Sequence, residues 1–313
     1  MDIKHIEIDY REGTPFHAEI CEIERIAPHY HNTSLEILFC LKGEVNYVAG
    51  AQKGVISGGQ VFSIDFEDIH YLYSDVPNMV LIFHLDLTGM YRPWEELKYI
   101  VFACESTHCF PYQYDPMNKV KDLMLALSLE SLTGCFHPEE SRDAANTLLD
   151  YLIRYFNYYN YHNPDGHMNE NLMERFYNIL RYCFENYKKK ITVSDLAESV
   201  HISKTYLSQY IKSTSYFSFT FMLKAIRCYK AEYLLLTTHM SNSEIAYACG
   251  FSDPKYLYSA FESIWGCSPH THRKNYRAYM SLTESYQTLS AEDAANQVRK
   301  HIIDWHIEKY ILD

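Results

Sequence analysis

Four side chains in the first quarter of the chain have the types and spacing of a metal-ligand set. They are His29, His31, Glu36 and His70. Because side chains alternate between the two faces of a strand, His29 and His31 would share one face. Neutral imidazoles with one carboxylate suit a divalent transition metal. The same groups could instead hydrogen-bond a ligand or serve the structure alone. We favour these uses, so neither a metal nor another cofactor is expected.

Short strands are the elements that would hold these side chains. Between residues 16 and 86 there is little helical periodicity, and runs rich in Ile, Val, Phe and Tyr are broken by Gly and Asn. The expected strands cover residues 36–41, 45–48, 60–65 and 79–85. They predict an antiparallel β-barrel or jelly roll over residues 1–115.

The polar residues of this region resemble the paired motifs of cupin barrels. The first motif is matched by His29, His31, Glu36 and Gly43, and the second by Gly59 and His70. The resemblance implies that the three histidines and the glutamate converge inside the barrel. The second motif departs from the pattern at Asp65, Glu67 and Ser74, where Pro, Gly and Asn are usual, and this counts against a metal.

A small-molecule pocket is the use of the barrel that we favour. Sugar recognition needs aromatic faces and a few fixed polar groups. The region supplies Tyr47, Phe62, Tyr71, Tyr73 and His84. We therefore expect a small polyol, most simply a sugar, in an effector pocket that includes His29, His31, Glu36 and His70.

A helix-turn-helix pattern occurs twice within residues 191–274. The first helices begin Asp195-Leu196-Ala197 and Glu244-Ile245-Ala246, and the second helices carry Tyr206-Leu207 and Tyr256-Leu257. Ser203 and Ser252 are predicted to cap the second helix of each copy. Pro254 suits a first helical turn. Residues 219–236 predict one helix, which would act as a rigid spacer.

The second copy and the residues after it resemble the signature of the AraC/XylS family of bacterial transcription regulators. The matching residues are Gly250, Phe251, Ser252, Tyr256, Phe261, Gly266, Pro269 and Arg273. The resemblance covers residues 170–280, about a third of the chain. It implies an all-α domain that binds double-stranded promoter DNA, with RNA polymerase as a further partner.

Two positions depart from that signature. Tyr216 stands where the family usually has Gly, and a left-handed conformation there would cost on the order of 1 kcal/mol. The recognition helix of the first copy could therefore end differently from that of the second. Leu257 replaces the usual Phe, a change that a core absorbs by repacking.

The exposed first turns of each recognition helix are expected to meet the edges of bases. The candidate base contacts are Thr205, Ser208, Gln209, Lys255 and Ser259. Gln209 suits adenine and Lys255 suits guanine. Lys204, Lys212 and Arg273 are expected to contact phosphates, which set register without reading sequence. The two recognition helices would enter successive major grooves roughly 34 Å apart.

Charge is divided unevenly along the chain. Residues 170–280 hold 14 Lys and Arg against 9 Asp and Glu, whereas residues 1–169 hold 11 against 25, and the whole chain has a net charge of −12. A basic module gains sequence-independent affinity for DNA by releasing counterions. The acidity of the whole chain hides this module.

Helices are also predicted between and after these two domains. Residues 118–132 and 139–158 carry apolar stripes and form a predicted hairpin (116–160), with Thr133-Gly134 and Phe136-His137-Pro138 at its turn. In the family such helices pair protomers, which implies a homodimer, although both stripes could pack on their own barrel. Residues 161–169 are the expected linker. A helix beginning at Ser290 is expected in a C-terminal extension (281–313), which could dock on either domain.

The remaining features narrow the functional class. The chain has 313 residues, enough for two domains, and its nine cysteines form no Cys-x-x-Cys pair, which favours a reducing compartment, the cytoplasm. No run of apolar residues suggests a signal segment or a membrane span. No phosphate-binding Gly-rich loop or Ser/His/Asp signature occurs, so an enzyme is not expected.

We therefore expect a ligand-responsive transcription regulator that activates genes of sugar or oligosaccharide uptake or catabolism. Two alternatives stay open. One is a stress or virulence regulator with a vestigial barrel, and the other is a metal-dependent cupin enzyme with an accessory helical module.

Overall fold

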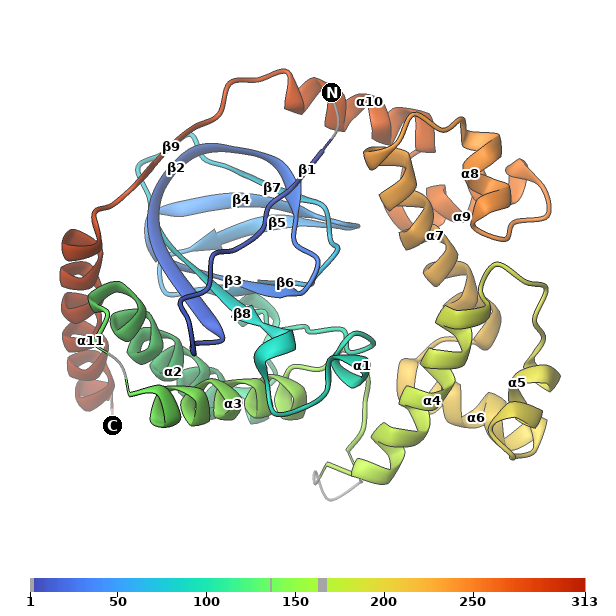
Figure 1. Ribbon diagram of the computed structural model, residues 1–313, viewed down its shortest axis with the longest axis horizontal. Coiled ribbons are helices and arrows are strands. Elements are labelled where there is room, and N and C mark those ends of the chain that lie inside the picture. The colour runs from blue at the N-terminus through green and yellow to red at the C-terminus, as the bar shows by residue number, and fades with distance from the viewer. Residues whose placement is uncertain (1–2, 136, 163–167, 313) are drawn as a thin grey trace. The chain divides into compact units, whose positions relative to one another are not determined.

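The computed structural model describes residues 3–135, 137–162 and 168–312, and these form two compact units (Figure 1). The barrel unit contains His5–Lys98, Phe102–Asn157 and the segment from Thr283 onward. The helical unit contains Tyr158–Leu282 together with Tyr99–Val101 and the described N-terminal residues through Lys4. Part of the predicted linker, residues 163–167, lies outside the described residues. The predicted domain boundaries stay predictions.

One antiparallel sheet makes up the barrel unit and confirms the predicted β-barrel. Its strands are β1 (Lys4–His5), β2 (Phe16–Tyr30), β3 (Ser34–Lys42), β4 (Glu44–Ala49), β5 (Gln52–Ser57), β6 (Val61–Ile64), β7 (His70–Tyr73), β8 (Met79–Asp86) and β9 (Ser285–Thr288). The order of the main strands is β5-β4-β7-β2-β8-β3-β6. The long strand β2 is central, because it pairs with β7, β8 and β9.

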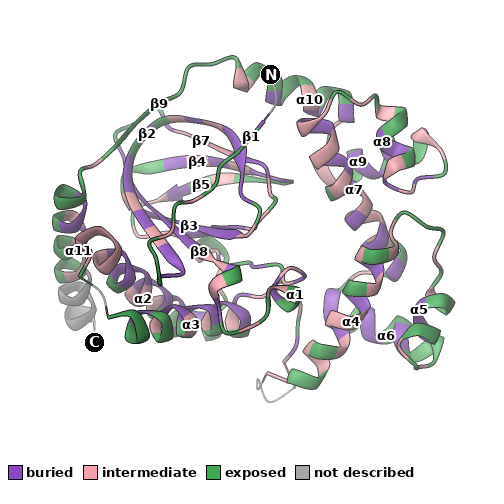
Figure 2. Cartoon of the chain, viewed as in Figure 1, coloured by how far each residue is buried: buried purple, intermediate pink, exposed green. Residues whose placement is uncertain are grey.

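Alternation along the strands fills the inside of the barrel with apolar side chains. Cys21, Leu38, Phe62, Leu72 and Ile82 belong to this core. Figure 2 shows buried residues along most strands of the barrel. The polar groups that interrupt this core are therefore held in a packed environment.

A helical hairpin covers part of the sheet. Its helices are α2 (Tyr114–Thr133) and α3 (Pro138–Tyr155), and Gly134 ends α2 with a φ of 68°. Phe136, in the predicted turn, lies outside the described residues. Helix α2 packs on β2 and on α3, and Leu148, Leu149 and Leu152 of α3 are fully buried. The apolar stripes of the hairpin thus pack within the same chain.

Short helices occupy the loop before α2, and a long helix ends the chain. They are η1 (Leu87–Gly89), α1 (Trp94–Leu97), η2 (Ser106–His108), η3 (Pro111–Gln113) and α11 (Ala291–Leu312). Ser290 accepts a hydrogen bond from the Asp293 amide, as expected for the start of a helix. Helix α11 packs on α2, so the C-terminal extension docks on the barrel unit. In the described part of the chain, no helix combines the length and apolarity needed to cross a bilayer.

Seven helices form the repeated core of the helical unit. They are α4 (Glu170–Asn186), α5 (Val193–Ser199), α6 (Lys204–Ser215), α7 (Phe219–Thr237), α8 (Asn242–Ala248), α9 (Pro254–Trp265) and α10 (Pro269–Met280). One apolar cluster holds α5 and α6 through Leu196 and Leu207, and another holds α8 and α9 through Ile245 and Leu257. Helix α7 contributes Ile226 to the first cluster and Leu235 to the second, so it is the predicted spacer.

The caps of the two copies confirm one predicted residue and correct another. Ser203 caps α6 by accepting from the Tyr206 amide. Ser252 was expected to cap α9, but this expectation is wrong, because Asp253 accepts from the Lys255 amide. The turn of the second copy is one residue longer, so Asp253 stands three residues before Tyr256, as Ser203 does before Tyr206.

Both recognition helices end in a left-handed residue. Gly266 ends α9 with a φ of 66°, as predicted, and Tyr216 ends α6 with a φ of 62°. The first copy therefore ends as the second does, although Tyr replaces the usual Gly.

Candidate functional site

The predicted histidines and glutamate meet at one end of the barrel. The Nε2 atoms of His31 and His70 lie 3.1 and 3.2 Å from Oε2 of Glu36. His29 completes the group, in which one ligand atom from each of the four residues lies within 4.8 Å of the others. The sequence thus identified four residues that the fold brings together from β2, β7, β3 and the turn after β2.

Each imidazole is oriented by a backbone carbonyl behind it. The Nδ1 atoms of His29, His31 and His70 lie 2.8–2.9 Å from the carbonyl oxygens of Ala27, Ile6 and Asp68. In a neutral ring, an Nδ1–H that donates to a carbonyl leaves a lone pair on Nε2. The Nε2 lone pairs of His31 and His70 then face a carboxylate oxygen of Glu36. All three atoms are hydrogen-bond acceptors, so a proton or a cation is needed between each nitrogen and the oxygen.

The charges at this centre are unequal. Burial raises the pKa of the Glu36 carboxyl, but His70 and the hydrogen bond from His31 outweigh it and hold this pKa well below its ordinary value. Burial lowers the pKa of His29. Burial would also lower the pKa of His31, but the hydrogen bond with Glu36 raises it. The centre is therefore a buried carboxylate with at least one neutral imidazole.

The donor set fits a metal. Nitrogen and carboxylate ligands are those of divalent transition metals, and carbonyls behind the rings are the usual outer shell. The other oxygen of Glu36, Oε1, is buried and has no hydrogen-bond partner among the described residues. All four residues are at most 7% exposed, so a ligand reaches them only if the lining opens.

Three further polar residues extend the centre, and of these the sequence singled out only His84. His84 stands opposite His17 in the sheet, and its Nδ1 lies 3.2 Å from Ser34 Oγ. Burial lowers the pKa of His84 to about 3, so this ring is neutral. No sequence motif contains His17 or Ser34, because strand register alone brings them to His84.

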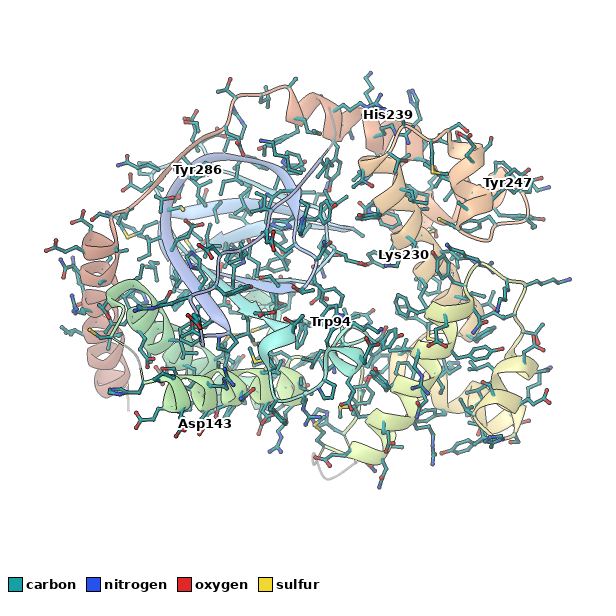
Figure 3. All side chains as sticks on the ribbon, in the orientation of Figure 1. Trp94, Asp143, Lys230, His239, Tyr247 and Tyr286 are labelled. Atoms are coloured by element: carbon teal, nitrogen blue, oxygen red, sulfur yellow. The ribbon has the colours of Figure 1, made fainter. Side chains whose placement is uncertain are left out.

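The predicted base-contacting residues all lie on exposed positions of α6 and α9. They are Thr205, Ser208, Gln209, Lys255 and Ser259. Leu207 and Leu257 of the same helices are buried, so each helix presents a polar face opposite its packed face. Figure 3 shows the outward side chains of this unit, among them the labelled Tyr247 of α8, which is 60% exposed. Base contact itself stays a prediction.

Tyr258 of α9 corresponds to Ser208 of α6. The observed caps, Ser203 and Asp253, give the same correspondence as the alignment of Tyr206 with Tyr256. Tyr258 is 39% exposed, and its hydroxyl accepts from the Asn242 side chain. The sequence analysis did not single out Tyr258, although its alignment of Tyr206 with Tyr256 already pairs Tyr258 with Ser208.

Charged residues near the recognition helices differ in their partners. Lys255 Nζ lies 3.6 Å from Asp253 Oδ2, so the predicted contact with a base would require Lys255 to leave this carboxylate. Lys204 and Lys212 are exposed. Arg273 is half-buried and donates to the carbonyls of Leu235 and Met240 at 2.7 and 2.8 Å. Its guanidinium therefore holds α10 to the end of α7, and its predicted phosphate contact stays untested.

The segment after α4 contacts the second copy and the spacer helix. A Cβ at Gly250 would lie 2.5 Å from the Tyr187 carbonyl oxygen, and Gly250 has a φ of 80°. Arg227 of α7 donates to the carbonyls of Tyr187 and Lys189. The end of α4 thus fixes the second copy against the first, in addition to the shared helix α7.

Comparisons with known proteins agree with this duplicated unit. A family model described as a helix-turn-helix domain matches residues 196–275. The HTH-type transcriptional regulator YdiP of Escherichia coli, itself uncharacterized, is 21% identical over 80% of this chain and 81% of its own length. The HTH-type transcriptional activator RhaR of an Enterobacter species is 24% identical over 78% of this chain and 85% of its own.

A solved structure is similar to part of this chain. It is the C-terminal domain of the two-component response regulator YesN of Fusobacterium nucleatum, which is 34% identical to this chain. The match covers 30% of this chain and 93% of that domain, with a TM-score of 0.29. This similarity in sequence extends over almost the whole of the solved domain.

Proposed function

The chain belongs to the AraC/XylS family of DNA-binding transcription regulators, and we propose that a small molecule in its barrel controls how α6 and α9 bind a promoter. The observation that carries the proposal is the pair of exposed polar faces on α6 and α9, held in fixed relation by α7 and Gly250. A ligand that binds one of two arrangements of the molecule better than the other shifts their populations. Promoter affinity changes with that shift.

The same proposal assigns partners and a sense of regulation. Double-stranded promoter DNA and RNA polymerase are the macromolecular partners, and activation is supported by the name of the activator RhaR. The effector is a sugar or another small polyol, and the target genes serve its uptake or catabolism. A homodimer is proposed from the family. Because the stripes of α2 and α3 are buried within the chain, another surface would have to form it.

Selection of genomic DNA by the purified protein tests the DNA-reading step. Gln209→Ala/Lys255→Ala removes one amide that suits adenine and one ammonium that suits guanine. We expect footprints on upstream fragments for the wild type, and a loss of discrimination of about 1–3 kcal/mol per lost base contact in the variant.

The matched control is Gln52→Ala/Lys53→Ala, which removes the same side-chain types from exposed positions of the barrel unit. It should keep specific binding, and circular dichroism should show both variants folded. Unchanged specificity in the first variant rejects the assigned base contacts. No protected DNA for the wild type at any ionic strength rejects the function.

We further propose that the barrel centre holds a divalent transition metal, ligated by His29, His31, Glu36 and His70. Two observations support a metal. The Nε2 lone pairs of His31 and His70 point toward Oε2 of Glu36, and Oε1 of Glu36 has no hydrogen-bond partner among the described residues. A bound metal would supply Lewis-acid attraction for a ligand oxygen. The three carbonyls behind the rings would hold the imidazoles in place. We prefer a metal-binding regulator to a metal-dependent enzyme, because the similar proteins are named as transcription regulators.

Metal content and thermal stability test this centre without an activity assay. We expect about one equivalent of zinc, iron or manganese in the wild type, and a lower Tm after chelation, since a ligand of the native state stabilises it. His29→Ala should lose the metal, whereas His84→Ala should keep it. Metal-free wild type whose Tm is insensitive to added zinc, iron and manganese refutes the metal. Metal with turnover of a substrate favours the enzyme.

A further inference from the structure

The C-terminal segment completes the sheet of the barrel. Strand β9 pairs with β2 in the register Cys21 with Thr288 and Ile23 with Tyr286. Cys21 also pairs with Val80 of β8, so β9 lies on the opposite edge of β2. Strand β7 occupies that edge from Arg25 to His29. Strand β9 therefore covers the part of the edge that β7 leaves open.

The first residues of this segment are anchored as well. Glu284 accepts from the Ala27 amide at 3.1 Å, and Ser285 donates to the Glu24 carboxylate at 2.6 Å. The Leu289 amide continues the pairing to the carbonyl of Ile20 at 2.9 Å. Residues 284–289 thus form a continuous strap along β2.

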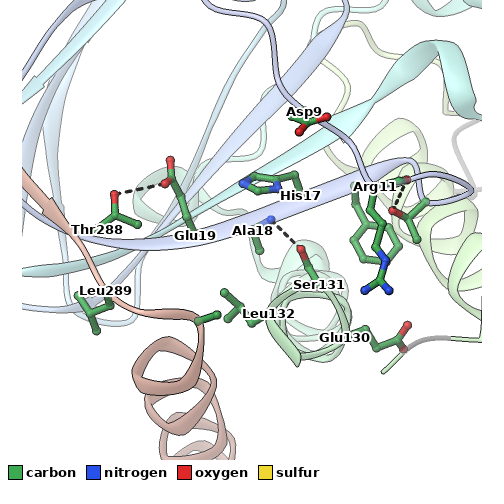
Figure 4. Close-up of a pocket in the computed structure, with 13 residues that line it drawn as sticks. Asp9, Arg11, His17, Ala18, Glu19, Glu130, Ser131, Leu132, Thr288 and Leu289 are labelled. Atoms are coloured by element: carbon green, nitrogen blue, oxygen red, sulfur yellow. Dashed lines mark hydrogen bonds between the residues drawn. The ribbon is translucent and has the colours of Figure 1, made fainter. Parts of the chain in front are cut away.

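A cavity of about 470 Å³ lies beside this strap. Its walls come from the segment before β2, from β2 itself, from the end of α2 and from β9 with the start of α11 (Figure 4). Glu19 of β2 and Thr288 of β9 are neighbours in its wall, where Thr288 Oγ1 donates to Glu19 Oε2 at 3.4 Å. The cavity therefore exists in this form only while β9 is paired.

The lining suits a neutral ligand that both donates and accepts hydrogen bonds. Glu19, Asp9 and Glu130 offer carboxylates, whereas Arg11, His17 and Thr288 offer donors. Burial raises the pKa of Glu19. An apolar ligand would remove these charged and polar groups from water at a cost, and a charged one would meet charge of its own sign. The hydroxyls of a polyol donate and accept at once.

The cavity adjoins the histidine centre. His17 and Glu19 lie on the same face of β2 as Cys21, inside the barrel, and the ring centroids of His17 and His84 are 6.4 Å apart. A ligand in the cavity would therefore be one imidazole away from the buried group, without entering it.

We infer that this cavity binds a neutral polyhydroxylated ligand and that the ligand holds β9 on β2. The pairing of β9 then influences the helical unit through the connecting residues 281–284. Helix α10 ends at Met280, so only these four residues separate it from β9. The inference rests on the proposed function and adds the ligand class, the site and the route of regulation.

A disulfide across β9 and β2 tests the route without any ligand. Thr288→Cys places a thiol opposite Cys21, whose Sγ lies 3.4 Å from the present Thr288 Oγ1. Facing residues of an antiparallel pair have the Cα spacing that a disulfide needs. We expect oxidation to change the affinity for the selected genomic fragment by at least about fivefold, the lower end of typical allosteric coupling. Reduction should reverse the change.

The control is Cys21→Ser/Thr288→Cys, which keeps the new thiol but lacks its partner. Its DNA affinity should not respond to oxidation. A bridge that forms without changing affinity overturns the route, and so does failure of the bridge to form. Absence of specific DNA binding in every redox state overturns the proposed function instead.

Thermal-shift measurements with glucose, galactose, maltose and cellobiose, each added singly, test the ligand class. We expect at least one of them to raise the Tm of the wild type and of Glu22→Gln, whose side chain is exposed outside the cavity. The shift should vanish in Glu19→Gln/Thr288→Val. No shift with any of the four overturns the ligand class, and a shift that survives in the double variant overturns the site.

Discussion

Tyr216 is a residue whose backbone conformation disfavours its own side chain. Its φ is 62°, and its side chain is 69% exposed, so little packing offsets the strain. A left-handed conformation costs a residue with a Cβ on the order of 1 kcal/mol, and Gly avoids this cost. We expect Tyr216→Gly to raise the free energy of unfolding of the helical unit by about 1 kcal/mol, measured by urea denaturation.

Gly266 provides the matched control for Tyr216. It ends α9 with a φ of 66°, and a Cβ there would meet no atom within 4 Å. Gly266→Ala therefore adds backbone strain and no clash, and should lower stability by about 1 kcal/mol. If Tyr216→Gly also lowered stability, the left-handed strain would not be the dominant effect at that position.

Lys212 and Arg273 were both predicted to contact phosphates, but the structure gives them different surroundings. Lys212 is exposed, whereas Arg273 donates to two carbonyls. We expect Lys212→Gln to reduce the salt dependence of DNA binding by about one unit of slope, with the stability unchanged. Arg273→Gln should instead lower the Tm, because it leaves those carbonyls unpaired. Binding titrations over a series of salt concentrations, with melting curves, separate the two effects.

At the scale of elements, the length of a turn decides which residue caps α9. Asp253 accepts from the Lys255 amide, whereas Ser252 is exposed and one residue too early. Loss of an N-cap costs about 1 kcal/mol. We expect Asp253→Ala to destabilise the helical unit by about this amount and Ser252→Ala to have almost no effect, as measured by urea denaturation. A larger loss for Ser252→Ala would contradict the cap seen in the structure.

Elements with a strong local period could be predicted from the sequence, and elements defined by their neighbours could not. Helix α7 follows the apolar spacing that predicted it, and strand β8 matches the run of apolar residues that predicted it. Strand β9 has three exposed residues out of four and no apolar alternation, so only the open edge of β2 makes it a strand. The four residues of the barrel centre were found because a motif contains them. His17 and Glu19 were missed, because sheet register and a distant segment bring them to the cavity.

For the molecule as a whole, the chain crosses between the two units more than once. It enters the main part of the helical unit at Tyr158 and returns to the barrel unit at Thr283, and Tyr99–Val101 also belong to the helical unit. The barrel portion before residue 170 is strongly acidic and residues 170–280 are basic. Because the helical unit is connected covalently to the barrel unit at both ends of residues 158–282, a change at the barrel can alter the freedom of the helical unit.

Removal of the C-terminal segment tests how far the stability of the barrel unit depends on the residues from Thr283 onward. A chain ending at Leu282 lacks β9, and it exposes the edge of β2 and the face of α2 that covers Ala294, Ala295 and Val298. Burial of a side chain such as Val298 contributes about 1.5–3 kcal/mol, and an open edge invites pairing between chains. We expect the truncated chain to melt at a lower temperature and to aggregate, as followed by calorimetry and light scattering.

In the full chain, Val298→Asp should reproduce the loss of stability, whereas Asn296→Asp, an exposed change on the same helix, should not. A truncated chain that is monodisperse and melts like the wild type would mean that the extension does not stabilise the barrel.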